Sequence, residues 1–364
     1  FPDWGKDRLQ SMLKSRADWC NSRQRKWGVP IPVVYCQDCG KEIIDNDIMM
    51  KISKIFGEEG SDAWFAHDTE YFLPEGFKCP HCGSAKGFDK EKDIMDVWFD
   101  SGSSHAAVCA RRKYLKVPAD VYLEGADQYR GWFQSSLLTS VAGGHGAPYK
   151  QIITHGWTVD GEGKKMSKSL GNGIAPQEII SKYGADILRL WVASADYHAD
   201  IRISPEILKQ ISDNYRKLRN TARYCLSNLY DFDPDKDMVS NDELEELDKY
   251  ALMKLDEVIK IARDAFEVYD YHTAAHSLHN FCVVEMSNFY FDVLKDRLYT
   301  SAPQSKTRRA AQTVLYKVLD ALTLVLTPIL AFTADEIWQS MPHDKSRNGE
   351  SPLFNEIPQP DFIE

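Results

Sequence analysis

The C-terminal part of the sequence repeats apolar residues at the spacing of an α-helix. Ser204 and Pro205 form a typical helix start. Apolar positions follow at Ile207, Leu208, Ile211, Tyr215 and Leu218. The same period predicts further helices over 242–268, 273–298 and 306–326, with a short one after Pro328, separated by polar breaks such as 231–237. We therefore predict an all-α bundle over 201–342 and a C-terminal tail over 343–364.

The aromatic residues of this predicted bundle are expected to pack in its core. Examples are Phe281, Phe289, Tyr290 and Trp338. Lysines and arginines gather instead on one face of the helix that starts at Pro205. They are Lys209, Arg216, Lys217, Arg219 and Arg223.

Residues 91–200 instead show short apolar runs that alternate with helical patterns. The runs at 96–100, 121–123 and 152–154 predict strands, and helical patterns follow the first two. This alternation predicts a parallel β-sheet, and polar residues at the carboxyl ends of the strands indicate a ligand site there. Residues 1–35, with a short helix over 7–14, are expected to lead into this α/β domain.

Residues 36–90 carry two matching Cys-x-x-Cys pairs, each followed by a glycine. The four candidate ligands are Cys36, Cys39, Cys79 and Cys82. Four thiolates complete a closed tetrahedral shell for structural zinc, and the glycine permits the tight turn that aims backbone N–H groups at the sulfurs. The alternative is a set of free thiols, and His81 is expected to stand outside the ligand set. We therefore predict a zinc-ribbon insertion, with a hairpin or helix in its long middle segment.

The segment 165–169 follows the third predicted strand and is strongly cationic. Lys165 and Lys168 alternate with the hydroxyls of Ser167 and Ser169, and glycines lie on both sides. Lysine acts on phosphate as a compact point charge, and a glycine-bounded loop can close over a polyphosphate and reopen. The alternative is a solvated basic turn.

Composition limits the classes of function. The chain has 364 residues and 43% apolar content, enough for two or three packed domains. A net charge of -10 gives no general attraction to nucleic acid, so an RNA partner would need local basic patches. One candidate is 16–27, where arginines accompany tryptophans that could equally be ordinary core.

The sequence contains no apolar stretch long enough for a membrane span, and its paired cysteines favour metal binding in a reducing, cytoplasmic environment. It starts at Phe1 without an initiator methionine, so we expect a piece of a longer chain.

Residues 165–169 match the KMSKS signature of the class I aminoacyl-tRNA synthetases, and the flanking sequence resembles the isoleucyl-tRNA synthetases. The resemblance rests also on 22–32, 96–102, 124–133, 154–161 and 185–191. It implies the C-terminal half of a Rossmann-type catalytic domain, a zinc-ribbon insertion and an anticodon-binding helical bundle. It also implies a ligase reaction, in which isoleucine and ATP give isoleucyl adenylate and pyrophosphate before isoleucine passes to tRNA(Ile). Structural Zn²⁺, Mg²⁺ accompanying ATP and a monomeric state are expected with it.

The resemblance also implies roles for single residues. Lys165 and Lys168 would hold the leaving pyrophosphate as catalytic residues. The expected ATP and adenylate contacts are Glu124, Gly125, Asp127, His155, Gly156, Met166, Ser167 and Ser169. The expected amino-acid contacts are Trp98, Gln128 and Trp132. The alternatives are core packing for the two tryptophans and helix capping for Glu124 and Asp127.

The sequence also departs from the family. The family's His-x-Gly-His element is missing, since the nearest sequence, 143–146, has its residues in the wrong order. No candidate for an editing domain is found either. Gly173 stands where the family usually carries valine. These gaps predict the C-terminal portion of a synthetase, inactive in adenylation by itself. The alternatives are a valyl or leucyl sibling, or a non-catalytic zinc-containing tRNA-binding module.

Overall fold

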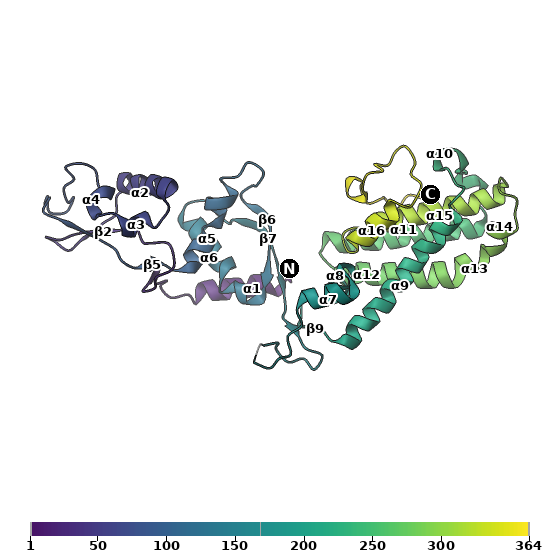
Figure 1. Cartoon of the computed structure of the whole chain (residues 1–364), viewed down its shortest axis with the longest axis horizontal. Coiled ribbons are helices and arrows are strands. Elements are labelled where there is room, and N and C mark those ends of the chain that lie inside the picture. The colour runs from purple at the N-terminus through teal and green to yellow at the C-terminus, as the bar shows by residue number, and fades with distance from the viewer. Residues whose placement is uncertain (1, 168, 363–364) are drawn as a thin grey trace. The chain divides into compact units, whose positions relative to one another are not determined.

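The structure, a computed structural model, describes residues 2–167 and 169–362 (Figure 1). The chain divides into two compact units, Phe1–His155 and Gly156–Glu364. The first holds the α/β part with the cysteine pairs, and the second is mostly helical, so the predicted fold class is confirmed. The finer boundaries proposed at 35, 90, 200 and 342 stay predictions.

Three antiparallel strands and three helices form the region around the cysteines. The strands, in the order β3-β2-β4, are β2 (Val34–Cys36), β3 (Glu42–Ile43) and β4 (Phe88–Lys90). The helices between β3 and β4 are α2 (Asn46–Glu59), α3 (Ala63–Ala66) and α4 (Thr69–Phe72). The carboxylate of Asp45 caps α2, and the apolar face of α2 packs with the fully buried Trp64 and Phe72. The helix expected within the middle segment is therefore confirmed.

A two-stranded parallel sheet forms the other part of the first unit. Its strands are β6 (Ala119–Gly125) and β7 (Tyr149–His155). A 3₁₀ turn, Ala126–Tyr129, and helix α6 (Trp132–Ala142) connect them. Helix α1 (Trp4–Lys14) packs through Leu9 and Met12 on the small core of Tyr122, Tyr129 and Phe133. The predicted strands at 121–123 and 152–154 and their parallel pairing are confirmed.

The predicted strand over 96–100 is wrong. These residues enter helix α5 (Val97–Gly102), and the strand is β5 (Ile94–Met95), which pairs with β1 (Ser22–Arg23). Asp96 explains the difference, because its carboxylate accepts a hydrogen bond from the N–H of Trp98 at 3.3 Å and so caps the helix. A π-helical turn, His105–Cys109, follows α5.

The second unit opens with a short parallel pair and two helices. The strands are β8 (Thr158–Val159) and β9 (Ile201–Arg202), and the helices are α7 (Pro176–Tyr183) and α8 (Ala185–Ala193). The bundle contains α9 (Pro205–Asn228), α11 (Glu246–Glu267), α12 (Tyr271–Asn280), α15 (Lys306–Leu326) and α16 (Ala331–Trp338). Ser204 caps α9 as predicted, and α15, which has the bounds predicted from the sequence, is buried along nearly its whole length.

Two details of the bundle differ from the prediction. The helix expected over 273–298 is interrupted, because a π-helical segment, Phe281–Tyr290, follows α12 and precedes the short helices α13 (Phe291–Val293) and α14 (Lys295–Tyr299). The break at 231–237 contains a one-turn helix, α10 (Pro234–Asp237). Phe281, Tyr290 and Trp338 are buried as expected, but the prediction for Phe289 is wrong, since 40% of it is exposed.

Ion pairs inside the bundle balance its buried charges. The carboxylate of Asp248 is fully buried and accepts two hydrogen bonds from the guanidinium of Arg297, at 2.9 and 2.8 Å. Asp231 likewise accepts two from Arg308. A buried charge without its partner is strongly destabilising.

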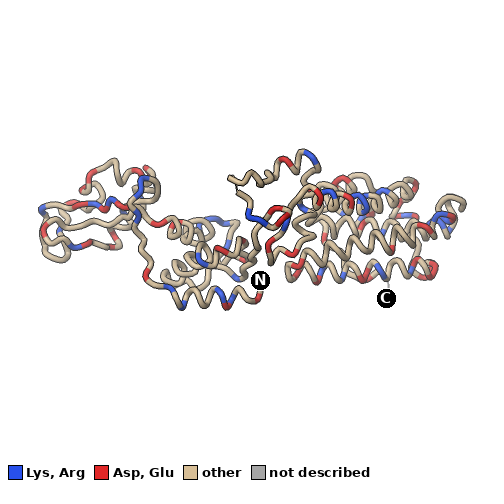
Figure 2. Tube along the Cα trace, turned by 90° about the horizontal axis from the view of Figure 1, so that it is seen from below, with Lys and Arg blue, Asp and Glu red and all other residues tan. Residues whose placement is uncertain are grey.

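Outside these buried pairs, charges of both signs are interspersed along each unit (Figure 2). Within residues 2–167 and 169–362, no helix has the length and apolar character needed to cross a bilayer.

Candidate functional site

The ends of strands β6 and β7 bring three of the predicted adenylate residues together. Glu124 pairs with Thr154 and Gly125 with His155 in the parallel register. A Cβ on Gly125 would lie 2.7 Å from Oδ1 of Asp127 and 3.6 Å from Cε1 of His155. A side chain at position 125 would therefore displace the Asp127 carboxylate from this strand end, where Glu124 is exposed.

Gln128 works as a helix cap in this structure. Its Oε1 accepts a hydrogen bond from the N–H of Trp132 at 2.9 Å, and its Nε2 donates to Oδ2 of Asp127 at 3.0 Å. The 3₁₀ turn Ala126–Tyr129 receives no side-chain cap, so the capping role considered for Glu124 and Asp127 belongs to Gln128. The amide of Gln128 keeps its second N–H and the second lone pair of Oε1 for contact with an amino acid.

The two predicted pocket tryptophans have different surroundings. The ring of Trp132 stacks on Tyr122, with centroids 4.0 Å apart and planes 2° from parallel, and its Nε1 donates to the carbonyl of Ser101. One face of Trp132 therefore belongs to the core. Trp98 is 40% exposed, and a Cβ on Gly131 would lie 2.8 Å from its ring edge. Trp98 thus keeps an open face beside the start of α6.

A cavity of about 790 Å³ lies next to Trp98. Its lining includes Arg23, Arg25, Lys26, Trp27, Phe65 and Trp98. Trp27 is 94% exposed, so the core alternative for this tryptophan is wrong. The cationic and aromatic segment noted in the sequence therefore does line a hollow of the first unit.

Asp96 fixes this cationic segment, and sequence reasoning did not single it out as a site residue. Its buried carboxylate accepts hydrogen bonds from Trp19 Nε1 and from the guanidinium of Arg23, both at 2.8 Å. Burial and the nearby Asp96 carboxylate raise the pKa of Asp100, which also lines the cavity. In the sequence, this role could be inferred only from a carboxylate that directly precedes an aromatic run, with arginines earlier in the chain.

The loop with the KMSKS sequence lies in the second unit. Lys165 forms an antiparallel bridge with Val159, and its Nζ lies 5.7 Å from the ring centroid of Trp157. Met166 is partly buried against the bundle core. Lys165 is otherwise exposed, so its ammonium group can meet a ligand.

The two serines of the loop are linked through their hydroxyls. Ser167 Oγ and Ser169 Oγ are 3.1 Å apart, and the N–H of Leu170 donates to Ser167 Oγ at 3.3 Å. Lys168, the other predicted catalytic residue, lies outside the described residues.

Asp160 and Asn172 hold this loop from outside the signature, and sequence reasoning missed both roles. Asp160 accepts hydrogen bonds from the backbone N–H groups of Glu162 and Lys164 and from Nδ2 of Asn172. The hydrogen bond from Asn172, followed by those from the backbone, lowers the pKa of the Asp160 carboxyl. An aspartate before a glycine-rich turn was the available signal.

Gly156 needs to be glycine for a steric reason. Its N–H donates to the carbonyl of Tyr197 at 2.8 Å, and a Cβ at this position would lie 2.4 Å from the backbone of Ala199. The segment after β7 is therefore packed directly against another backbone segment of the second unit.

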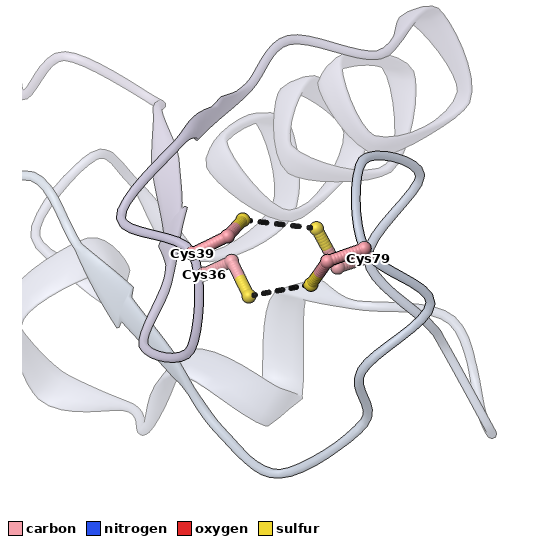
Figure 3. Close-up of side chains that lie close together, drawn as sticks. Cys36, Cys39 and Cys79 are labelled. Carbon is pink, nitrogen blue, oxygen red and sulfur yellow. Dashed lines mark hydrogen bonds between the residues drawn. The ribbon is translucent and has the colours of Figure 1, made fainter.

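The four predicted metal ligands meet in one cluster (Figure 3). All four Sγ atoms lie within 4.8 Å of one another, with Cys36 to Cys82 at 3.7 Å and Cys39 to Cys79 at 3.8 Å. Tetrahedral zinc with Zn–S bonds of about 2.3 Å separates its sulfurs by about 3.8 Å. The cluster therefore has the dimensions of a Cys₄ zinc site.

The two cysteine turns share one local geometry. Gly40 and Gly83 both have positive φ, +69° and +77°, and each donates its N–H to the carbonyl of the first cysteine of its pair at 2.8 Å. Burial raises the pKa of the Cys79 thiol, but N–H groups of His81 and Cys82, together with hydrogen bonds from the Cys82 and Cys36 thiols, outweigh burial and lower that pKa to about 6. The His81 ring is turned away, toward the carbonyl of Glu42, as expected for a residue outside the ligand set.

The basic face predicted on α9 is partly neutralised. Arg219 makes a bidentate ion pair with Glu336, and Arg216 pairs with Asp213. Lys209, Lys217 and Arg223 are exposed on the same helix.

Comparison with known proteins finds two family models that match this chain. Residues 1–204 match the family described as tRNA synthetases class I (I, L, M and V), and residues 248–364 match the anticodon-binding domain of tRNA ligase. The isoleucine–tRNA ligase of Caldanaerobacter subterraneus subsp. tengcongensis is 58% identical over 99% of this chain, and that of Syntrophomonas wolfei is 54% identical over 99%. In both cases the chain spans 38% of the relative's length.

Solved structures of low sequence identity share the fold. The ternary complex of Agrobacterium radiobacter K84 agnB2 LeuRS with tRNA and LeuAMS superposes with a TM-score of 0.68 at 20% identity, covering 97% of this chain and 44% of that one. Mycobacterium tuberculosis methionyl-tRNA synthetase bound by methionyl-adenylate gives 0.67 at 18% identity, covering 99% and 61%. With the KMSKS loop, the paired strand ends and these matches together, the chain belongs to the class I tRNA synthetases of the isoleucine, leucine, methionine and valine group.

Proposed function

We propose that this chain is the part of an isoleucine–tRNA ligase that holds one side of the adenylation site, the zinc centre and the anticodon-binding bundle. The identity of 58% over 99% of the chain to isoleucine–tRNA ligases carries this proposal. The strand ends of β6 and β7 and the loop after β8 support it, because they offer the residue types that an adenylate and a leaving pyrophosphate require.

In the first step, isoleucine attacks the α-phosphorus of ATP and pyrophosphate leaves. No covalent protein intermediate is needed, so these residues act by placement and by charge stabilisation. Lys165 and Lys168 neutralise the leaving pyrophosphate, with Ser167 and Ser169 as hydroxyl donors. The lysine ammonium must swing away from Trp157, a weak contact that a polyphosphate outcompetes.

The remaining predicted residues hold the nucleoside and the amino acid. Glu124, Gly125 and Asp127 are assigned to the ribose and adenylate. His155, Gly156 and the backbone of Met166 are assigned to the adenine. Trp98 and Trp132 are assigned to the isoleucine side chain, whose burial against flat faces excludes water, and Gln128 to the amino-acid end. Mg²⁺ is expected with ATP.

We assign structural zinc to Cys36, Cys39, Cys79 and Cys82, on the strength of their sulfur separations. With four protein ligands the shell is closed, so zinc would stabilise the fold of the region rather than take part in the reaction. None of the eight cysteines, all of which lie within the described residues, forms a disulfide, which fits a reducing, cytoplasmic location.

We assign the bundle to tRNA(Ile), acting as part of a monomer. The match of residues 248–364 to an anticodon-binding domain supports this assignment. Exposed basic residues of α9 supply local positive charge on a chain whose net charge is -10.

The test is aminoacylation by the complete product of the gene that encodes this chain. We expect charging of tRNA(Ile) with isoleucine. Preferential charging with valine or leucine would identify a sibling synthetase. Binding of tRNA and zinc with no charging of any of the three amino acids would favour the non-catalytic module.

A further inference from the structure

Asn172 connects the backbone of the KMSKS loop to Asp160. Its Nδ2 donates to Oδ2 of Asp160 at 2.8 Å and to the carbonyl of Lys165 at 3.3 Å. Its Oδ1 accepts a hydrogen bond from the N–H of Ser167 at 3.0 Å. One amide therefore contacts the backbone on both sides of Met166, at the point where the predicted pyrophosphate ligands begin.

Asp160 connects the same amide to the opposite arm of the loop. Its Oδ1 accepts from the N–H groups of Glu162 and Lys164, at 3.0 and 2.8 Å, and its own N–H donates to the carbonyl of Lys164. The turn between them requires Gly163, which has a φ of +84°. A single carboxylate thus ties both arms of an exposed loop together.

We propose that Asp160 and Asn172 are positioning residues that hold the backbone of Lys165 and Ser167 in the geometry needed for pyrophosphate to leave. This inference rests on the proposed function and adds to it two residues outside the signature. A lysine has a long and flexible stem, so its ammonium group reaches a fixed point only if its backbone is held. Holding that backbone before ATP binds removes part of the ordering that the transition state would otherwise require.

The polarity of the pair allows a sharp test, because aspartate and asparagine have nearly the same shape. Asn172→Asp places two carboxylates against each other and removes the donor to Lys165. Adding Asp160→Asn reverses the pair, so that residue 160 donates and residue 172 accepts, while residue 160 still offers an oxygen to Glu162 and Lys164. If the hydrogen bond matters, the double variant recovers part of what the single variant loses.

The first measurement is hydrogen exchange on the 364-residue chain. We expect Asn172→Asp to speed exchange of the Ser167 and Lys164 amides about tenfold, because it removes both hydrogen bonds donated by Nδ2 and adds a repulsion between carboxylates. The double variant should recover most of that protection. Asn46→Asp, the same change at an exposed position of α2, should leave the loop unchanged. Unaltered hydrogen exchange of the loop in Asn172→Asp, or no recovery of protection in the double variant, would contradict the proposal that Asp160 and Asn172 hold the loop backbone.

The second measurement is isoleucine-dependent exchange of pyrophosphate into ATP by the complete gene product. We expect Asn172→Asp to lower kcat about 100-fold, the scale of a small misplacement of a catalytic group, with KM for isoleucine unchanged within about twofold. The double variant should recover at least about tenfold. Unchanged kcat in Asn172→Asp would overturn the positioning role. Absence of pyrophosphate exchange in the unmodified protein would instead refute the proposed function. The holding of the loop backbone by Asp160 and Asn172 would then be decided by hydrogen exchange.

Discussion

The four-cysteine cluster and the KMSKS loop are both built on turns bounded by glycine, yet they are held in different ways. In the cysteine cluster, the residues of the motif also form the site, since the four sulfurs face one another and a glycine of positive φ shapes each turn. In the loop, Lys165 and Ser169 are exposed, and hydrogen bonds with Asp160 and Asn172 order the backbone around them. A sequence motif whose residues all bind one metal predicts its own local structure. A motif that binds a leaving group predicts the chemistry of its site but not the residues that hold the motif in place.

The difference suits the two proposed roles. A structural metal site gains from rigidity, so its supports are covalent geometry and metal coordination. A loop that must admit ATP and release pyrophosphate needs supports that are weaker and reversible. We therefore expect the two regions to respond very differently to matched changes.

The largest expected effect is loss of zinc. Cys36→Ala should abolish stoichiometric zinc and unfold the region around β2 and β4, since structural zinc supplies about 10 kcal/mol or more of binding free energy in small domains. Metal analysis and hydrogen exchange across 34–90 would show this. Cys20→Ala, at an exposed cysteine outside the cluster, is the control. Full protection of β2 and β4 in zinc-free Cys36→Ala would contradict a structural role for the metal.

The next effect is on catalysis by the complete gene product. Lys168→Ala and Lys165→Ala should each lower kcat of pyrophosphate exchange about 10²–10³-fold, because each removes charge stabilisation of the leaving group. KM for isoleucine should change by less than about threefold. Lys164→Ala is a matched control, since that side chain pairs with Glu162. A raised KM for isoleucine with unchanged kcat would remove the assigned role.

A smaller effect should follow from matched glycine changes. Gly40→Ala and Gly163→Ala both force an L side chain into positive φ, at +69° and +84°, which costs roughly 1–2 kcal/mol. Hydrogen exchange should show lost protection in the loop for Gly163→Ala. For Gly40→Ala, bound zinc should hide the loss, which would reappear as weaker metal binding in competition with a chelator. Equal loss of protection in both regions with zinc bound would break the comparison.

The smallest expected effect is the pH response of the loop. The pKa of Asp160 is lowered in the folded protein by the hydrogen bond from Asn172 and then by backbone N–H groups. A lowered carboxyl pKa stabilises the folded loop above the ordinary pKa of aspartate, and this is lost as pH falls through the folded value. Loop protection, corrected for intrinsic exchange rates, should therefore be constant near neutral pH and fall only in acid below pH of about 4. In Asp160→Asn this acid step should be absent; its persistence would assign it to another group.

Much of this fold is predictable from the sequence because local and tertiary signals agree. The cap at Ser204 and the apolar period of α15 both favour helix, and both helices begin where predicted. The strand prediction over 96–100 failed because the aromatic residues there favoured a strand, while the only indication of a helix was one carboxylate, Asp96. The π-helical segment Phe281–Tyr290 changes the helical period without a break in the apolar pattern, so periodicity cannot reveal it.

The candidate site was predictable in its chemistry and less so in its supports. The clustering of the four cysteines and the strand ends at Gly125 and His155 follow from spacing and from the geometry of parallel strands. The helix cap formed by Gln128 and the hydrogen bond from the Ser167 N–H to Asn172 could not be predicted in this way. An amide side chain can form hydrogen bonds with many partners, and only the folded backbone selects one.

The assignment of this chain to an isoleucine–tRNA ligase depends on one measurement, the exchange of pyrophosphate into ATP by the complete gene product with isoleucine, valine and leucine in turn. We expect exchange that depends on isoleucine, with kcat/KM higher than for either competitor, and a large loss of that exchange in Lys168→Ala. Exchange that favours valine or leucine, or that survives in Lys168→Ala, would contradict that assignment.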